Sequence, residues 1–216
     1  MDEKGKQLTP LYGRLLIRLT RPFPDFDFRF IKPVRRRAVE LLSLKSGDSV
    51  LDVGCGPGGS LPFLVEAVGP LGRVVAVEIS PEHAELARRR IAKNEWKNAE
   101  VIVSSAQEVK LAGTFDGLVM FAAPDVYASP EALDNLIPHL NDRARIVAFG
   151  AKLSTRPLGR LFNPVIKLLI RLSFSTTPKP ELEPLRILSN YVEDLVIDEY
   201  FFGLMFLASA TLSNKK

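Results

Sequence analysis

Short apolar runs alternate along this chain with segments whose apolar residues recur at helical spacing. The runs of strand length are Val50–Val53, Val74–Val77, Val101–Val103, Phe115–Phe121 and Arg145–Phe149. Between them, 58–68 and the segment that ends near Lys93 have the period of a helix. Strands that alternate with helices of about ten residues indicate a parallel sheet with right-handed crossovers. The pattern predicts a doubly wound α/β fold with helices on both faces.

Two helix starts are marked by a serine followed by a proline. Ser80 and Pro81 precede Glu82, and Ser129 and Pro130 precede another helical segment. A serine hydroxyl can accept a hydrogen bond from a free N–H of the first turn, and proline is tolerated there because it lacks an N–H. We therefore expect N-caps at both serines.

The alternation of strands and helices changes after Gly150. The pattern predicts a helix over about 158–172, a polar link over 173–184, and strands over 191–200 and 204–211 joined near 201–203. Such a short connection favours an antiparallel hairpin at one edge of the sheet. Residues 1–45 are expected to form an N-terminal helical cover, and 46–216 a single globular unit.

Composition limits the class of protein. The chain has 216 residues, 46% hydrophobic and 25% charged, which is the balance of a globular domain with one substantial core. No apolar run reaches the roughly 18 residues of a membrane-spanning helix, and the charged start at Met1–Gln7 is unlike a secretory signal. We therefore expect a cytoplasmic protein.

Charge and metal-ligand types add little. A net charge of +4 is weak evidence for a polyanionic partner, and the arginine runs 35–37 and 88–90 are expected to form solvated helix faces. Cys55 is the only cysteine, and the two histidines, His83 and His139, are far apart in the sequence. Neither a disulfide nor a cysteine zinc site is possible within the chain, and no metal is expected.

A glycine-rich loop carries the strongest indication of a ligand. Gly54, Gly56 and Gly58 follow one predicted strand and open a helix, so that backbone can approach a ligand closely at a helix N-terminus. Gly59 completes the spacing G-x-G-x-x-G, and acidic Glu78 follows about 20 residues later. The glycines alone are compatible with a dinucleotide or with another nucleoside cofactor.

Asp52 helps to separate these two possibilities. Its carboxylate stands two residues before the first glycine, where it would repel a pyrophosphate but attract an ammonium group. S-adenosylmethionine carries an ammonium group. The sequences VLDVGCGPG (50–58), VVAVEI (74–79) and FDGLVMF (115–121) resemble the first, second and fourth motifs of the S-adenosylmethionine-dependent methyltransferases with a Rossmann-like fold.

The resemblance implies a mostly parallel seven-stranded sheet with a C-terminal antiparallel hairpin, and S-adenosylmethionine as cofactor. It places Asp52 at the methionine ammonium and Glu78 at the ribose hydroxyls, which two carboxylate oxygens can accept together. The remaining cofactor-binding positions that it implies are Gly54, Cys55, Gly56, Gly58, Ile79, Ser105, Ala106, Gln107 and Phe121.

The chain departs from the family pattern at two places. Many relatives carry aspartate where this chain has Ser105, so the contact with the adenine amino group would lack charge assistance or rely on Gln107 and backbone. Ala122-Ala123-Pro124 replaces the Asn-Pro-Pro-Tyr type of sequence found in enzymes that methylate amino groups of nucleic acids. A DNA partner is therefore not expected.

No general base is evident in the sequence. His83 and His139 are more typical of structural or exposed positions, and Cys55 of a small packing residue than of a nucleophile. A methyl group on a sulfonium is already activated, so an amine, thiol, enolate or carboxylate acceptor needs little assistance. Tyr12 and Tyr127 are candidates to line the acceptor site, although either is also typical of a core aromatic.

Two segments outside the cofactor motifs bear on the acceptor. In 156–172, Arg156, Arg160, Lys167 and Arg171 fall on one side of a single predicted helix, and 11–21 repeats the mixture of leucine and arginine. A basic amphipathic helix can contact a membrane surface, here the inner face, or it can pack on the sheet with its cations in water.

The order of an N-terminal Tyr-Gly-Arg (12–14), the glycine loop and a C-terminal GLMFLASA strand (203–210) is similar to that in small bacterial phospholipid and quinone methyltransferases. We therefore expect a small apolar or amphiphilic acceptor. A noncatalytic protein of the same fold, an RNA methyltransferase and a dinucleotide-dependent oxidoreductase remain as alternatives, the last of which leaves Asp52 unexplained.

Overall fold

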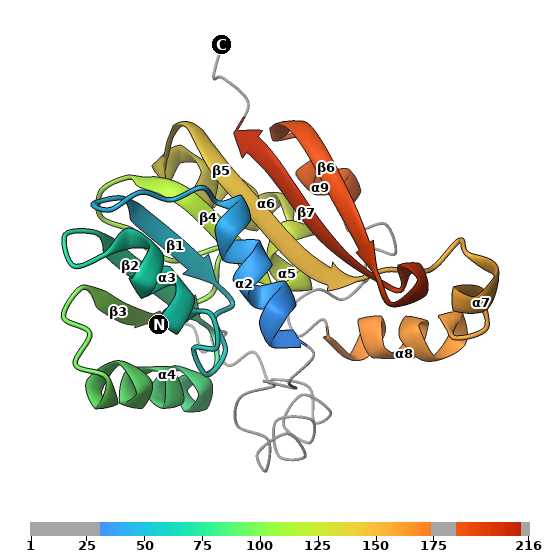
Figure 1. Cartoon of the computed structure of the whole chain (residues 1–216), viewed down its shortest axis with the longest axis horizontal. Helices are drawn as coiled ribbons and strands as arrows, with labels where there is room; N and C mark the ends of the chain where they lie inside the picture. Colours follow the sequence, from blue (N-terminus) through green and yellow to red (C-terminus); the bar gives the residue numbers. More distant parts are fainter. Residues whose placement is uncertain (1–30, 174–184, 213–216) are drawn as a thin grey trace, which may run out of the picture.

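A computed structural model describes residues 31–173 and 185–212, with side chains throughout except at 169–173 (Figure 1). Seven strands form one sheet in the order β3-β2-β1-β4-β5-β7-β6. The strands are β1 Ser49–Val53, β2 Arg73–Glu78, β3 Ala99–Val103, β4 Phe115–Phe121, β5 Leu140–Ala151, β6 Val192–Tyr200 and β7 Met205–Leu212. The first five are parallel, and β7 is antiparallel to both of its neighbours. The predicted fold class and edge hairpin are confirmed.

Helices cover both faces of this sheet. They are α2 Ile31–Leu41, α3 Leu61–Val68, α4 Pro81–Lys93, α5 Pro124–Tyr127, α6 Pro130–Leu136, α7 Pro157–Arg160, α8 Asn163–Ser173 and α9 Leu185–Leu188, with 3-10 turns η1 Ile137–His139 and η2 Phe201–Gly203. Apolar side chains of α2, α3 and α4 join one buried cluster, and those of α5, α6 and α9 join another. The sheet separates the two clusters.

Alternation along the strands assigns each residue to one of these faces. Val50 belongs to the cluster under α2 and α3, whereas Leu51 belongs to the opposite cluster, because successive side chains of a strand point to opposite sides. Val74 and Val119 lie on the same face as Val50. Residues two positions further along each strand therefore share that face.

Both expected serine caps are present. Ser80 Oγ accepts a hydrogen bond from the His83 N–H at 3.3 Å, and Ser129 Oγ accepts one from the Ala132 N–H at 3.2 Å. Each satisfies one of the free donors of a helix start. Because α4 and α6 begin at defined residues, the loops that precede them at the carboxyl edge of the sheet are fixed.

The single helix predicted over 158–172 is wrong, because the structure has two helices there, α7 and α8. Pro164 lacks the N–H that would continue the hydrogen-bond ladder to Arg160, and Asn163 turns back toward the preceding loop. The Asn163 amide donates to the Ser154 carbonyl at 3.0 Å, and its oxygen accepts from the Ser154 N–H at 2.9 Å. The cations before and after this break therefore do not lie on one face of a single continuous helix, as the sequence predicted.

Three further expectations concern the ends of the chain and the membrane. Tyr12, the segment 11–21 and the polar link that was predicted at 173–184 fall largely or wholly outside the described residues. Helix α2 lies within 1–45 and packs on the sheet face that carries Val50. Within 31–173 and 185–212, no helix has both the length and the apolar character needed to cross a bilayer.

Candidate functional site

Three of the sequence-predicted residues lie together at the carboxyl ends of β2, β1 and β4. These three strands are neighbours in the sheet. Asp52 lies next to Ala76 and Val119 in strand register, and Glu78 and Phe121 end the flanking strands two residues further on. By the alternation of side chains, all three point to the face that α2 covers. The topology of the sheet changes direction at β1 and β4, which is where ligands bind in open α/β sheets.

Asp52 is the most unusual group in this region. Its side chain is fully buried, and neither carboxylate oxygen has a hydrogen-bond partner among the described residues. Burial raises the pKa of Asp52 from 3.8 to about 7, against the opposing effect of the Arg35 charge and with a smaller contribution from Glu78. A buried carboxylate without a partner is costly, so its presence indicates a ligand that supplies a cation or donors.

Arg35, on α2, corrects the prediction that the run 35–37 is a solvated face. Arg36 and Arg37 are exposed, but Arg35 is buried, and its Nη1 donates to Ser60 Oγ at 2.9 Å. The guanidinium lies 4.1 Å from the centre of the Phe121 ring. A buried arginine held by a hydroxyl and an aromatic face is a fixed positive charge beside Asp52.

The position of Arg35 was detectable in the sequence. Ile31, Arg35, Ala38 and Leu42 are spaced by four, three and four residues, which places the arginine on the buried stripe of the helix. Three consecutive arginines obscured this periodicity, because a charge run usually indicates solvent exposure.

The glycine loop passes directly over the ends of β1 and β2. The Gly54 and Cys55 N–H groups donate to the Val77 carbonyl at 2.8 and 3.1 Å. Gly54 has φ +75°, and a Cβ built there would lie 2.5 Å from Ala123 Cβ, so that this position accepts only glycine. Gly56 also has a positive φ, of +56°, but a Cβ there would meet no atom within 4 Å. The loop therefore presents backbone to open space at Gly56.

Glu78 ties this loop to the start of α4. One carboxylate oxygen accepts from the Gly56 N–H at 2.8 Å and the other from the Ser80 N–H at 2.9 Å. The side chain is buried, so both contacts are protected from water. Each oxygen keeps a second lone pair for a ligand hydroxyl.

The segment after β3 faces α5 and α6. The Gln107 amide donates to the Asp125 carbonyl at 3.5 Å and to Ser129 Oγ at 3.4 Å, and the Ser105 hydroxyl donates to Glu108 at 3.4 Å. Ala106 is buried. Ile79, directly after Glu78, is 46% exposed, which leaves an apolar surface at the end of β2.

Phe121 lies between two planar groups. Its ring stacks on Phe149 with a centroid distance of 4.3 Å, and Arg35 covers its other side. Directly after it, Ala122 has φ +61°, a conformation that is strained for a residue with a Cβ. Such strain is typical of backbone that is held in place for a ligand.

The remaining candidates are placed in the core or outside the described residues. Tyr127 is buried, packs edge-on against Phe206 at 5.8 Å, and lies where a Cβ of Gly150 would touch its hydroxyl. The alternative interpretation, a core aromatic, therefore describes its position. Cys55 is buried, and burial, followed by the charges of Asp52 and Glu78, raises the pKa of its thiol well above the usual value. A thiol of that kind packs rather than attacks.

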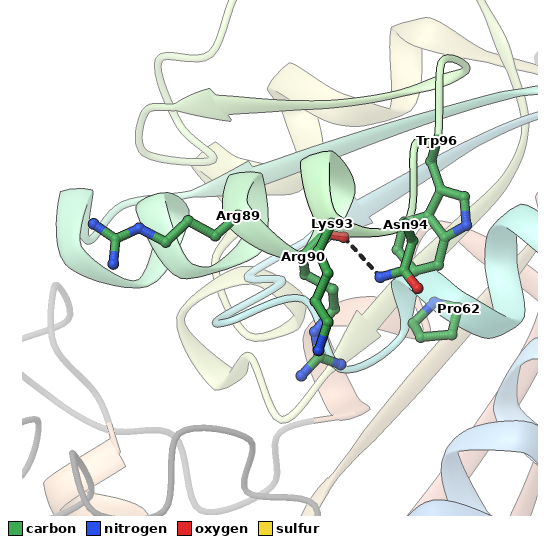
Figure 2. Close-up of a pocket in the computed structure, with 6 residues that line it drawn as sticks. All are labelled: Pro62, Arg89, Arg90, Lys93, Asn94 and Trp96. Carbon is green, nitrogen blue, oxygen red and sulfur yellow. Dashed lines mark hydrogen bonds between the residues drawn. The ribbon is translucent and has the colours of Figure 1, made fainter.

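A separate surface pocket lies along α4 (Figure 2). It encloses about 380 Å³ and is lined by Pro62, Arg89, Arg90, Lys93, Asn94 and Trp96. None of the sequence-predicted site residues lines it, although Arg90 Nη1 donates to the Gly58 carbonyl at 3.3 Å. Within the described ranges, no group of three or more histidine, cysteine, aspartate or glutamate side chains could hold a metal ion.

A known protein family matches this chain over most of the residues at the carboxyl edge of the sheet. Positions 50–143 match a family described as a methyltransferase domain. The chain is 36% identical over 109 residues to protein-L-isoaspartate O-methyltransferase 2 of Archaeoglobus fulgidus, covering 50% of this chain and 48% of that protein. It is 30% identical over 128 residues to a demethylmenaquinone methyltransferase of Symbiobacterium thermophilum, covering 58% and 50%. The chain thus spans about half the length of these curated relatives.

The fold has a wider match. The crystal structure of a SAM dependent methyltransferase from Aquifex aeolicus superposes with a TM-score of 0.65 at 22% identity, covering 93% of this chain and 98% of that one. The matched family segment includes β1, β2 and β4 with Asp52 and Glu78. Residues 50–143 therefore match a methyltransferase domain, and the chain has the fold of a SAM dependent methyltransferase.

Proposed function

We propose that this protein transfers the methyl group of S-adenosylmethionine, by in-line displacement, to a small apolar or amphiphilic acceptor. The observation that carries the proposal is Asp52, a fully buried carboxylate without a hydrogen-bond partner in the described part of the chain. It lies beside a glycine loop that is open at Gly56. An anionic group that is otherwise unpaired, next to accessible backbone, fits the ammonium end of this cofactor.

The residues around Asp52 fit the rest of an amino-acid group. Asp52 would bind the ammonium, and the backbone of Gly54, Cys55 and Gly56 would pack against the methionine and ribose. Arg35 holds a positive charge on the same side, where it opposes the effect of burial and favours the ionised form of Asp52. Phe121 would limit water around the methionine portion, since its ring is already covered by Arg35 and Phe149.

The nucleoside end would be held at β2 and β3. Glu78, oriented by two backbone N–H groups, would accept hydrogen bonds from both ribose hydroxyls with its remaining lone pairs. Ile79 offers exposed apolar surface to the adenine ring, and Ser105, Ala106 and Gln107 border that position. Gly58 contributes by allowing the tight turn, since its N–H donates to the Cys55 carbonyl at 3.0 Å.

When bound, the cofactor supplies a methyl group on a sulfonium, which is activated for displacement. The contribution of the protein would be to hold an acceptor in line in a site from which Phe121, Phe149 and Ala123 exclude water. The proposal of an apolar or amphiphilic acceptor is supported by these apolar side chains and by the similarity to a demethylmenaquinone methyltransferase. We also propose that 1–45 covers a methyltransferase unit formed by 46–216, with α2 as part of the cover.

Calorimetric titration with S-adenosylmethionine tests the cofactor site. Saturable binding to the wild type, its loss in Asp52→Ala, and no binding of NAD are expected. Methyl transfer is then measured with quinols, lipids, amines and isoaspartyl peptides as acceptors. Binding of the cofactor without transfer to any of them would favour a noncatalytic protein, and transfer to RNA or to water-soluble acceptors alone would contradict the proposed acceptor class.

A further inference from the structure

One end of the molecule exposes an unusual number of large apolar side chains. They come from α7, from α8 and from η2 at the tip of the β6–β7 hairpin. We define the apolar end as Leu158, Leu161, Phe162, Val165, Leu168 and Phe202, each of which is at least 53% exposed. Single exposed apolar residues are normal on a protein surface, but a group of this size usually marks a contact with another molecule.

The apolar end is a built surface, because α7 and the loop before it lie directly against the hairpin tip. The Ser154 hydroxyl donates to the Phe202 carbonyl at 2.6 Å. A Cβ at Gly159 would lie 2.3 Å from the same carbonyl, so α7 approaches η2 as closely as backbone allows. Figure 1 shows α7 beside the hairpin tip, at the opposite end of the molecule from α4, and α8 running from α7 back toward the middle of the molecule. The exposed side chains of helices and hairpin therefore form one surface.

The helical segment of this surface carries cations and no acids. From 151 to 173 the sequence contains five lysines and arginines and no aspartate or glutamate. Arg156 pairs with Glu199, but Arg160 and Lys167 are exposed, and no ion pair joins either to a described residue. The surface thus combines apolar side chains with a net positive charge, which is complementary to an anionic amphiphilic surface.

We propose that the apolar end, together with Arg160 and Lys167, docks this protein on the surface of an anionic lipid bilayer. Over its 11 residues α8 is about 16 Å long at ~1.5 Å per residue, far short of a ~30 Å hydrocarbon core. The helix can therefore lie in the interface but cannot span it. A second copy docked on the same surface across a two-fold axis would place cations against cations.

Vesicle co-sedimentation of the full-length protein tests the proposal. Phosphatidylcholine vesicles with phosphatidylglycerol are expected to bind the wild type, more strongly at low salt, and pure phosphatidylcholine vesicles to bind it weakly. Arg160→Ala with Lys167→Ala should weaken binding about 25-fold, from about fivefold for each cation. Leu161→Asp with Leu168→Asp should abolish it, because charge then replaces inserted apolar surface.

A matched control removes the same net charge elsewhere. Arg89 and Lys93 lie on α4 (Figure 2), and Arg89→Ala with Lys93→Ala should leave vesicle binding close to that of the wild type. All variants are first checked for an unchanged unfolding temperature and for cofactor binding without vesicles. Since those checks do not involve lipid, failure of the docking proposal is distinguishable from failure of the proposed methyltransferase activity.

Two results would overturn the docking proposal. One is no binding of the wild type to anionic vesicles, and the other is equal loss of binding in the α4 control. If vesicles do not bind and sedimentation velocity shows dimers that the Leu161→Asp, Leu168→Asp variant converts to monomers, a second copy occupies the surface instead.

Discussion

Replacing Asp52 by asparagine is expected to stabilise the cofactor-free protein while removing its response to S-adenosylmethionine. The carboxylate is fully buried, and its only described electrostatic support is the charge of Arg35. An ionised group in that position costs free energy of folding, which the neutral amide avoids. The same negative charge is what the ammonium of the cofactor would require. Stability and binding should therefore change in opposite directions.

The magnitude follows from the pKa of Asp52, which burial raises from 3.8 to about 7. Since the folded-state pKa is the higher one, the native state keeps its proton up to about pH 7, whereas the unfolded state loses it near pH 4. Stability from this group is therefore present at low pH, declines through that window and is level above it. A difference of about 3 pKa units corresponds to about 4 kcal/mol at pH 8.

Thermal unfolding of wild type and Asp52→Asn from pH 5 to pH 8 measures this effect. The stability advantage of the variant over the wild type should grow by about 2–3 kcal/mol from pH 5 to pH 8. For a chain of this size, that growth corresponds to roughly 5–10 °C in Tm. Asp142→Asn, at an exposed aspartate of β5, is the matched control and should show a constant difference. A difference for Asp52→Asn that does not change with pH would refute a raised pKa.

Four other substitutions test the backbone and the ribose contact. Gly56→Ala should fold with a loss of about 1–2 kcal/mol for its positive φ yet bind S-adenosylmethionine at least about tenfold more weakly by calorimetry, because its Cβ enters the open space. Gly54→Ala should lower the free energy of unfolding by about 1–3 kcal/mol, and with it the unfolding temperature, since its Cβ would overlap that of Ala123; normal stability would refute the close approach. Ala122→Gly should gain about 0.5–1 kcal/mol in denaturant unfolding, and a loss would contradict strain at φ +61°. Glu78→Gln should weaken cofactor binding about 10-fold or more, and unchanged affinity in the same titration would exclude the ribose role.

The sequence alone was enough to predict the sheet and the glycine loop at its carboxyl edge. Glycine spacing, the serine caps and short apolar runs are local patterns, so they predict β1, β2, β4 and the start of α4 without knowledge of distant contacts. The boundaries of β5 were harder to predict. It begins at Leu140, five residues before the predicted 145, because Leu140 pairs with Phe115 of β4 and the polar residues after it follow a left-handed turn of the backbone at Arg143.

The parts that sequence missed depend on contacts between elements far apart in the chain. Arg35 becomes a site residue only because Ser60, at the start of α3, and Phe121, at the end of β4, contact it. For Tyr127 the sequence left both an acceptor-site and a core position open, and the structure has it in the core, where Phe206 of β7 packs edge-on against its ring. The break before α8 had a local cause, Asn163-Pro164, which the apolar periodicity on both sides concealed.

The order β5-β7-β6 has a consequence for how the protein is made. β5 ends at Ala151, yet its neighbour β7 begins only at Met205, after β6 has been translated. Until β7 leaves the ribosome, Ile146–Phe149 form an apolar strand with an unpaired edge, and unpaired edges recruit other chains. A nascent chain paused between these strands is thus the species that needs a chaperone most.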